Sequence, residues 1–301
     1  MEKTRHIICY LTLIFLFITI NSFAQTRTCG MVEYMSQQMQ NPEFARQHQE
    51  NQTKFRAALV KNTNSRNSSR RTTLIIPVAV HFPSGLETDR ACLEVLSQIQ
   101  VEVLNRDYTA TNRDSNLWNA ASSLYPGVNR GATDIEFRIA TQNHPKNLDP
   151  ELLEGNPAVS IGYNFGNGED EDTSWSGYMN FVVKKLNIGE LGYSPLGGSV
   201  LAGNSVVMDI KAFGSGTGCP GSGVVPEAHY DLGRTLTHEL GHFFNLDHTF
   251  SLSCDSDDGI SDTPNIIEPN HDCPSNGSVA GCVSGEKALT MNYMDYTNDE
   301  C

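Results

Sequence analysis

The first apolar pattern in this chain of 301 residues is a run from Ile7 to Ile20, which follows a basic start and ends in small residues near Ala24. This arrangement is typical of a secretory signal peptide. The run is shorter than the roughly 20 residues that a membrane-spanning helix needs. We therefore expect residues 1–24 to be a signal peptide, with a membrane anchor as the alternative.

Residues 25–71 form a polar segment rich in Asn, Gln, Ser and Arg. It ends in NTNSRNSSRR, which has no apolar periodicity and predicts an exposed, cleavable linker. The segment has eight basic and three acidic residues, a net charge of +5, whereas residues 72–301 have eleven basic and 31 acidic residues, a net charge of −20. Opposite charges favour packing of the segment against the acidic domain, although acidity also serves solubility.

From residue 72 onward the pattern predicts regular elements. TLIIPVAVHF (73–82) reads as a buried strand, with Pro77 indicating an edge or a bulge. DIEFRIA (134–140), GYMNFVVKKL (177–186) and NSVVMDI (204–210) predict three more strands. Residues 91–108 predict a long amphipathic helix, because five apolar residues recur there at helical spacing: Leu93, Leu96, Ile99, Val103 and Leu104.

The stretch HELGHFFNLDH (238–248) carries the clearest chemical signal. On a helix, His238 and His242 share one face with Cβ atoms about 6 Å apart, so both imidazoles can bind one zinc ion. Asn245 tolerates the left-handed conformation that would end the helix, and His248 would then complete the ligand set. Three protein ligands leave a position for water, as in catalytic zinc sites, and Glu239 lies within reach of that water. Chance occurrence is the alternative, at roughly fewer than one such sequence in a thousand.

The motif HExxHxxNxxH resembles that of the metzincin metallopeptidases. With DDGISDTPN (257–265) and MNYMDYTNDEC (291–301), the chain from about residue 72 to 301 resembles the pappalysin family, especially its secreted bacterial members. Metzincins usually have Gly where this chain has Asn245. Because Asn is among the residues that adopt positive φ most readily, this departure is compatible with the same turn.

The resemblance implies an α/β, metzincin-like zincin fold. A twisted, mostly parallel sheet with backing and active-site helices (upper subdomain, about 72–245) would lie over an irregular, disulfide-stapled C-terminal subdomain (about 246–301). Relatives usually continue into a final helix, which leaves open whether this chain is a C-terminally truncated fragment.

The resemblance also implies roles for individual residues. His238, His242 and His248 would hold zinc, and Glu239 would act as general base for a zinc-activated water. Met294 would form a methionine turn beneath the imidazoles, and Tyr296 would direct its hydroxyl toward the metal. Without the histidines, NYMDY would read as an ordinary core-lining turn.

Cysteines are the next clue, because seven of the eight remain once the signal peptide is removed. Secretion favours disulfides, and the four cysteines after residue 249 allow three connectivities. The resemblance implies Cys254–Cys282 and Cys273–Cys301. A Cys29 thiolate could then occupy the open zinc position as a zymogen switch. A disulfide from Cys29 to Cys92 or to Cys219 is the alternative. The pairing of Cys92 and Cys219 stays open.

Two further sites are implied by the resemblance. DSDDGISDT would bind calcium through Asp258, the Ser261 carbonyl and Thr263, because hard oxygen donors suit this ion; a solvated acidic turn is the alternative. Glu300 would line the pocket beyond the scissile bond and favour Arg or Lys there, since a carboxylate pairs with a guanidinium. A plain surface charge is the alternative for Glu300.

We therefore expect a secreted zinc-dependent endopeptidase, made as a latent zymogen with residues 25–71 as its own inhibitory pro-segment and 72–301 as the catalytic domain. Its partners would be protein or peptide substrates, with no nucleic acid and no membrane span in the mature chain. A secreted zinc-containing binding module without turnover is the main alternative, and Glu239 distinguishes the two, since binding alone does not need it. A non-metal adhesion protein is a more distant alternative.

Overall fold

The computed structural model describes residues 28–63 and 73–301, so the expected signal peptide and most of the expected linker lie outside the described residues. The strands are β1 (Thr28–Cys29), β2 (Leu74–Phe82), β3 (Ile135–Ile139), β4 (Val159–Ile161), β5 (Met179–Lys184), β6 (Glu190–Tyr193) and β7 (Ser205–Asp209). The α-helices are α1 (Met31–Gln38), α2 (Pro42–Thr63), α3 (Arg90–Tyr108), α4 (Ser115–Ala121) and α5 (Arg234–Phe243). Short 3-10 helices span Glu87–Asp89, Ser122–Leu124, Phe165–Gly168 and Thr173–Trp175.

The strands form one seven-stranded sheet in the order β1-β6-β7-β5-β2-β3, with β4 also paired to β2. Pairing is antiparallel between β6 and β7 and parallel between the other neighbours. The predicted α/β class with a mostly parallel sheet is confirmed. The four predicted strands are β2, β3, β5 and β7, whereas the short β1, β4 and β6 were not predicted, because two to four residues show no periodicity.

Strand β2 lies inside the sheet, so the expectation of an edge strand from Pro77 is only locally correct. Residues Leu74–Val78 pair with β3, and pairing with β5 begins at Val78. Pro77 therefore lies where β2 has a neighbour on one side alone, and its missing N–H costs no ladder bond on the open side.

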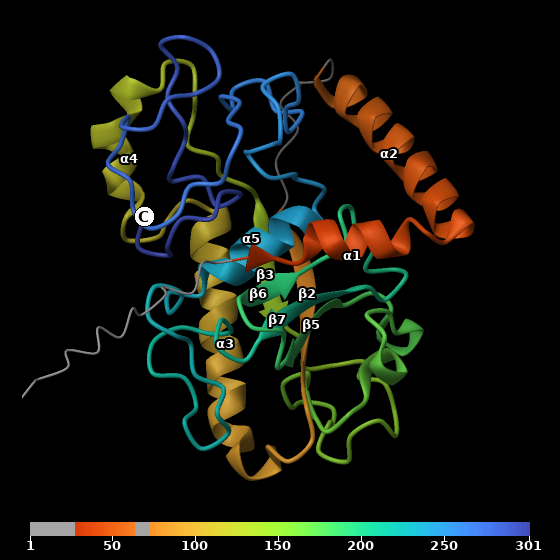
Figure 1. Ribbon diagram of the computed structural model, residues 1–301. Coiled ribbons are helices and arrows are strands. Elements are labelled where there is room, and N and C mark those ends of the chain that lie inside the picture. Colours follow the sequence, from red (N-terminus) through yellow and green to blue (C-terminus); the bar gives the residue numbers. More distant parts are fainter. Residues whose placement is uncertain (1–27, 64–72) are drawn as a thin grey trace, which may run out of the picture.

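One face of the sheet packs against α3 and α5 (Figure 1). Leu93, Leu96 and Leu104 of α3 are buried there, as predicted, but Ile99 and Val103 are only partly buried. Gln100 is fully buried instead, because its side chain donates to the Gly233 carbonyl (2.9 Å) and accepts from the Gly214 amide (2.7 Å). A polar side chain whose hydrogen bonds are all made can be buried in the core, even where the apolar pattern of the sequence points to the residues beside it.

The opposite face of the sheet is covered by irregular segments between β3 and β5, whose core includes Trp175 and Phe165. Strand β2 serves both faces, since Val78 and Val80 lie in the α3–α5 core and Ala79 in the second core. This alternation is the pleat of a strand buried on both sides.

Residues 246–301 contain no helix or extended strand among the described residues, as the resemblance implied for the lower part. Disulfides join Cys254 to Cys282 and Cys273 to Cys301, the pairing that the resemblance implied. A third disulfide joins Cys92 of α3 to Cys219, a pair that the sequence left open. Helix α4 and the turn after it also pack against the lower part, through Tyr125 and Leu289.

The N-terminal segment 28–63 lies against the domain. Strand β1 extends the sheet beside β6, and α1 contacts β6 (Figure 1). Helix α2 is exposed along most of its length. Within residues 28–63 and 73–301, no helix has the length and apolar character needed to cross a bilayer.

Candidate active site

Helix α5 presents the histidine motif from the centre of the fold, and all ten of its residues are buried. Its first turn is tied to the chain end, because the Asp299 carboxylate accepts from the backbone amides of Leu232 (3.0 Å) and Arg234 (3.1 Å). Charge-assisted bonds of this kind stabilise a helix N-terminus. Asp299 was not predicted, since its distance in sequence from the helix hides this role.

The helix ends at a Schellman turn centred on Asn245. Asn245 has φ of 71°, its amide donates to the His242 carbonyl (2.8 Å), and the Leu246 amide donates to the Gly241 carbonyl (2.9 Å). These two bonds define the motif. The turn predicted at Asn245 is therefore present, and it brings His248 back over the helix.

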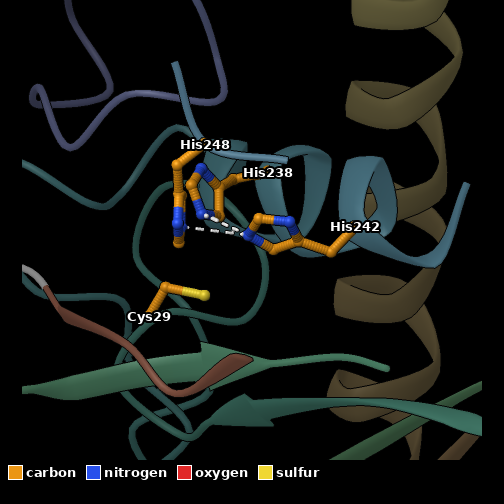
Figure 2. A group of neighbouring side chains, drawn as sticks. All are labelled: Cys29, His238, His242 and His248. Atoms are coloured by element: carbon orange, nitrogen blue, oxygen red, sulfur yellow. Dashed lines mark hydrogen bonds between the residues drawn. The ribbon is translucent and has the colours of Figure 1, made fainter. Parts of the chain in front are cut away.

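The three predicted histidines converge. His242 Nε2 lies 3.2 Å from His238 Nε2 and 3.1 Å from His248 Nε2, and all three side chains are buried (Figure 2). Nitrogen ligands of one tetrahedral zinc ion, each about 2.0–2.1 Å from it, lie about 3.3 Å apart. The spacing of the rings therefore fits one shared cation.

The tautomers of two rings favour a cation as well. His238 Nδ1 is 2.5 Å from the Tyr293 carbonyl, and His242 Nδ1 is 2.7 Å from the Leu246 carbonyl. A carbonyl accepts only from N–H, so in the neutral rings both Nε2 atoms carry lone pairs. Lone pairs that face each other at this distance repel unless a positive ion lies between them, so the arrangement of the three rings suits a bound metal ion.

Met294, the residue to which the resemblance assigned the methionine turn, packs against helix α5 at Gly241. Met294 is 6% exposed, and its Sδ would lie only 2.4 Å from a Cβ placed on Gly241. Gly241 therefore has no room for a side chain while Met294 stays where it is. The residue before Met294 is also held in place, because the Tyr293 hydroxyl donates to Asp107 of α3 (3.1 Å).

Asp107 is a supporting residue that the sequence analysis missed. It also accepts from the Thr237 hydroxyl of α5 (2.8 Å). Asp107 therefore links α5 to Tyr293, whose carbonyl binds the His238 ring. Burial raises the pKa of Asp107, and the nearby Arg234 guanidinium partly offsets this rise. The sequence did contain a sign that Asp107 is buried, because it lies one helical turn beyond Leu104 on the buried face of α3.

Glu239 lies at the same site and is 1% exposed. A Cβ placed on Gly192 of β6 would lie 2.8 Å from Glu239 Cγ, so the glycine allows the glutamate to pack against the strand. Glu239 Oε2 lies 3.3 Å from the Cys29 thiol. The sequence-predicted base is therefore next to the histidines and faces β6.

Cys29 and Tyr296 complete the group. The Cys29 sulfur and one nitrogen from each of the three histidines all lie within 4.8 Å of one another. The amide of Cys29 donates to the Tyr296 hydroxyl (3.3 Å), and the Tyr296 ring lies 5.1 Å from the His248 ring. Cys29 takes part in none of the three disulfides of the described residues.

Two of the predicted calcium residues, Ser261 and Thr263, line a hollow of about 320 Å³, and Asp257 and Asn265 also line it. The Asp258 carboxylate accepts from the Ile260 amide (2.9 Å) and interacts with Thr263. Burial raises the pKa of Asp258, as do the neighbouring Asp257 and Asp247. An excess of oxygen donors and negative charge is therefore present at this loop.

Glu300 lies near the N-terminal end of α5, and its Oε1 accepts from His229 Nδ1 at 2.8 Å. This hydrogen bond raises the pKa of His229. Burial acts to raise the pKa of Glu300, but hydrogen bonds from His229, from the backbone and from Asn298, together with the charge of His229, lower it on balance. Glu300 is therefore a charged group held by a histidine.

One contact of the N-terminal segment with the site had no sequence signal. Gln52 of α2 and Asn245 join their side-chain amides in both directions, with Asn245 Nδ2 donating to Gln52 Oε1 at 3.1 Å and Gln52 Nε2 donating to Asn245 Oδ1. The residue that ends α5 thus also binds the segment that lies over the site.

Comparison with known proteins agrees with this geometry. The family described as Pregnancy-associated plasma protein-A matches residues 225–301, which include the three histidines and Met294. The fold is similar to that of mature mirolysin of Tannerella forsythia in complex with a cleaved peptide, with 30% identity, a TM-score of 0.57, and coverage of 77% of this chain and 87% of that one. An extracellular metalloprotease of Arthroderma otae is 32% identical over 206 residues, 67% of this chain and 70% of that protein. The chain belongs to the pappalysin family of metallopeptidases.

This pappalysin is also similar to a Glu-to-Ala mutant of Tannerella forsythia promirolysin, with 27% identity, a TM-score of 0.63 and coverage of 91% of this chain. Extracellular metalloprotease 1 of Coccidioides posadasii is 35% identical over 122 residues. The match to the first curated relatives spans less than half of their length, 42% for that protein and 26% for an extracellular metalloprotease of Colletotrichum graminicola.

Proposed function

We propose that this chain is a secreted zinc-dependent endopeptidase that is made as a latent zymogen, with residues 1–24 as signal peptide, 25–71 as pro-segment and 72–301 as catalytic domain. The observation that carries the proposal is the convergence of three buried imidazole nitrogens beside Glu239. Secretion is supported by the relatives, which are named extracellular metalloproteases.

His238, His242 and His248 hold the metal, and three imidazoles with one further position are the donor set of a catalytic zinc site. When bound, zinc acidifies a water molecule and polarises a carbonyl oxygen at neutral pH. The carbonyls of Tyr293 and Leu246 orient two of the rings. Met294, which packs against Gly241 of α5, forms the methionine turn in this proposal.

Glu239 and Tyr296 carry the acid–base and electrostatic steps. The Glu239 carboxylate takes a proton from the attacking water and returns it to the departing amine nitrogen. The Tyr296 hydroxyl donates to the oxygen of the peptide carbonyl as negative charge develops there. Both side chains contact Cys29, so they face the same small space.

Strand β6 offers the main-chain binding edge for a peptide. With residues 28–63 in place, the Thr28 amide donates to the Gly189 carbonyl (3.1 Å) and the Gly30 amide to the Gly192 carbonyl (2.9 Å). Once β1 leaves, these carbonyls become an open sheet edge beside Glu239, which an extended substrate can extend.

Latency follows from the same contacts. Cys29 offers a sulfur to the ion held by the histidines, and thiolate is a soft ligand that zinc accepts. Coverage of 91% of this chain by promirolysin, against 77% by the mature form, supports a pro-segment. The alternative of a Cys29 disulfide to Cys92 or Cys219 is not favoured, because those two cysteines are bonded to each other.

Two finer assignments belong to the same proposal. Asp258, the Ser261 carbonyl and Thr263 bind a structural calcium ion, since oxygen donors gather there and the pKa of Asp258 is raised by burial. Glu300 favours Arg or Lys after the scissile bond, and the arginine-rich sequence at the end of the pro-segment is then suited to self-cleavage.

Glu239→Gln tests the central proposal. The variant should retain zinc at one equivalent after dialysis and lose peptide turnover by about 10²-fold or more, since general acid–base catalysis contributes about that much. Glu102→Gln, on the exposed side of α3, is the matched control and should keep full activity. A chelator should abolish turnover in the wild type. Full turnover by Glu239→Gln would rule out this base, and zinc binding without turnover in the wild type would favour a binding module.

A further inference from the structure

The tyrosine rings of Tyr34 and Tyr193 stack across the boundary between the N-terminal segment and the domain. Their centroids lie 5.4 Å apart, with an angle of 28° between the ring planes. Tyr34 belongs to α1, and Tyr193 ends β6, the strand that passes the metal site. Both rings are only partly exposed. The segment therefore fills an aromatic surface of the domain.

The domain holds the Tyr193 ring in place without help from Tyr34. The Tyr193 hydroxyl lies 3.1 Å from both carboxylate oxygens of Asp170. Lys184 Nζ lies 5.5 Å from the centre of the Tyr193 ring and 3.2 Å from Asp170. A ring fixed at its hydroxyl and packed by a cation keeps its orientation, so it is a preformed binding surface.

This surface adjoins the site of the proposed cleavage. In the register of β1 and β6, Cys29 pairs with Gly192, and Tyr193 is the next residue of β6. A strand advances about 3.3 Å per residue, so a side chain within three residues of the scissile bond can reach Tyr193. Leu196 extends the apolar surface, since it packs against buried Met35 of α1 and its amide lies 3.4 Å from the Met35 sulfur.

The charge around the ring limits which side chains fit. The pKa of Tyr34 is raised by burial and then by Asp170, Glu171 and Glu169. Negative potential at this position disfavours acidic side chains of a substrate. Basic side chains gain little there, because the Asp170 carboxylate is already paired with Lys184. A neutral flat ring, such as the one that lies there, fits both the platform and the charge.

We propose that Tyr193, with Asp170 and Leu196, forms a specificity subsite that binds an aromatic side chain of the substrate within three residues of the cleaved bond. Tyr34 occupies this subsite in the precursor. The assignment rests on the proposed peptidase function, and it is separate from the preference proposed for Glu300 because it concerns a different type of side chain.

The test compares the full chain, activated by limited trypsin digestion, with the variants Tyr193→Ala and Tyr193→Phe on an equimolar peptide library, with products identified by mass spectrometry. The wild type should enrich Tyr, Phe and Trp at one position near the cleaved bond by roughly 2- to 10-fold, the range expected for an aromatic pair. Tyr193→Phe should keep most of this enrichment, and Tyr193→Ala should lose it, measured as the ratio of aromatic to non-aromatic products within the same digest. Zinc content and melting temperature show whether each variant is folded.

An equal aromatic preference in Tyr193→Ala, or a preference for Arg, Lys or no residue type at that position, would overturn the subsite. A binding assay in the Glu239→Ala background separates this result from failure of the peptidase function. There a Tyr-bearing peptide should bind more tightly than its Ala counterpart by the same roughly 2- to 10-fold, and Tyr193→Ala should remove the difference. Equal binding of both peptides would overturn the subsite even in a chain without turnover.

Discussion

The Cys29 thiol lies 3.3 Å from Glu239 Oε2, a contact between residues 210 positions apart in the sequence. The amide of Cys29 also donates to the Tyr296 hydroxyl. One residue of the N-terminal segment therefore contacts both side chains that we propose for proton transfer and oxyanion binding. Under the proposed function, a substrate and the segment 28–63 would compete for the same groups, and the segment would have to leave before a peptide could reach them.

Replacement of Cys29 tests the switch. Cys29→Ala removes the sulfur near the histidines, so the precursor should show turnover before processing and degrade itself during expression. Intact-mass measurement of freshly purified protein and hydrolysis of a fluorogenic peptide check this expectation. Val32→Ala, at an exposed position of α1, is the control and should leave the precursor latent. A Cys29→Ala precursor as stable and latent as the wild type would exclude the switch.

The amide pair of Gln52 and Asn245 should act as a second hold on the segment. Gln52→Ala and Asn245→Gly each remove the pair, and each should speed activation of the precursor by about 5-fold, given about 1 kcal/mol for the hydrogen bonds. Gly keeps the turn because φ of 71° suits it. Asn245→Ala should lose about 1 kcal/mol more stability, because Ala tolerates this conformation less well.

Activation is followed by the rate at which activity appears after a limiting dose of trypsin. Gln40→Ala, an exposed residue between α1 and α2, is the matched amide control. Equal activation rates for Gln52→Ala and the wild type would show that the amide pair does not retain the segment.

The disulfides should differ in their contribution to stability. The bridges Cys254–Cys282 and Cys273–Cys301 each span 28 positions, whereas Cys92–Cys219 spans 127. Loop-closure entropy predicts about 3–4 kcal/mol for each short loop and about 5 kcal/mol for the long one. Paired Cys→Ala variants and urea unfolding measure the differences. A smaller loss for the Cys92–Cys219 variant than for the others would contradict an entropic origin.

The Glu300–His229 contact predicts a pH dependence. Because the hydrogen bond to Glu300 raises the pKa of His229, this histidine should titrate above its ordinary value of about 6.5. Stability from the pair is then present between the lowered pKa of Glu300 and the raised pKa of His229. It is lost as the pH rises through the pKa of His229, and also as the pH falls through that of Glu300. NMR titration should give an ordinary pKa in Glu300→Gln and a raised one in the control Glu227→Gln. An unchanged His229 pKa in Glu300→Gln would exclude the contact in solution.

The histidine motif could be predicted from the sequence because its geometry is local. A helix places residues four apart on one face, and Asn245 ends that helix through its own backbone preference. Likewise, the β-rich composition of 73–82 and the helical spacing of apolar residues in 91–108 predicted β2 and α3, since both signals lie within a short stretch of sequence. The family resemblance then implied the lower, disulfide-linked part.

Contacts between distant residues were decided by the tertiary structure. Nothing local in the sequence relates Cys29 to Glu239, Gln52 to Asn245 or Tyr34 to Tyr193, and the burial of Gln100 and Asp107 depends on partners in other elements. The physical reason is that periodicity reports which face of an element is buried, while the partner on that face depends on how the whole chain packs. The sequence by itself thus determined the candidate metal ligands and the strand and helix that support them, and the tertiary structure decided what covers them.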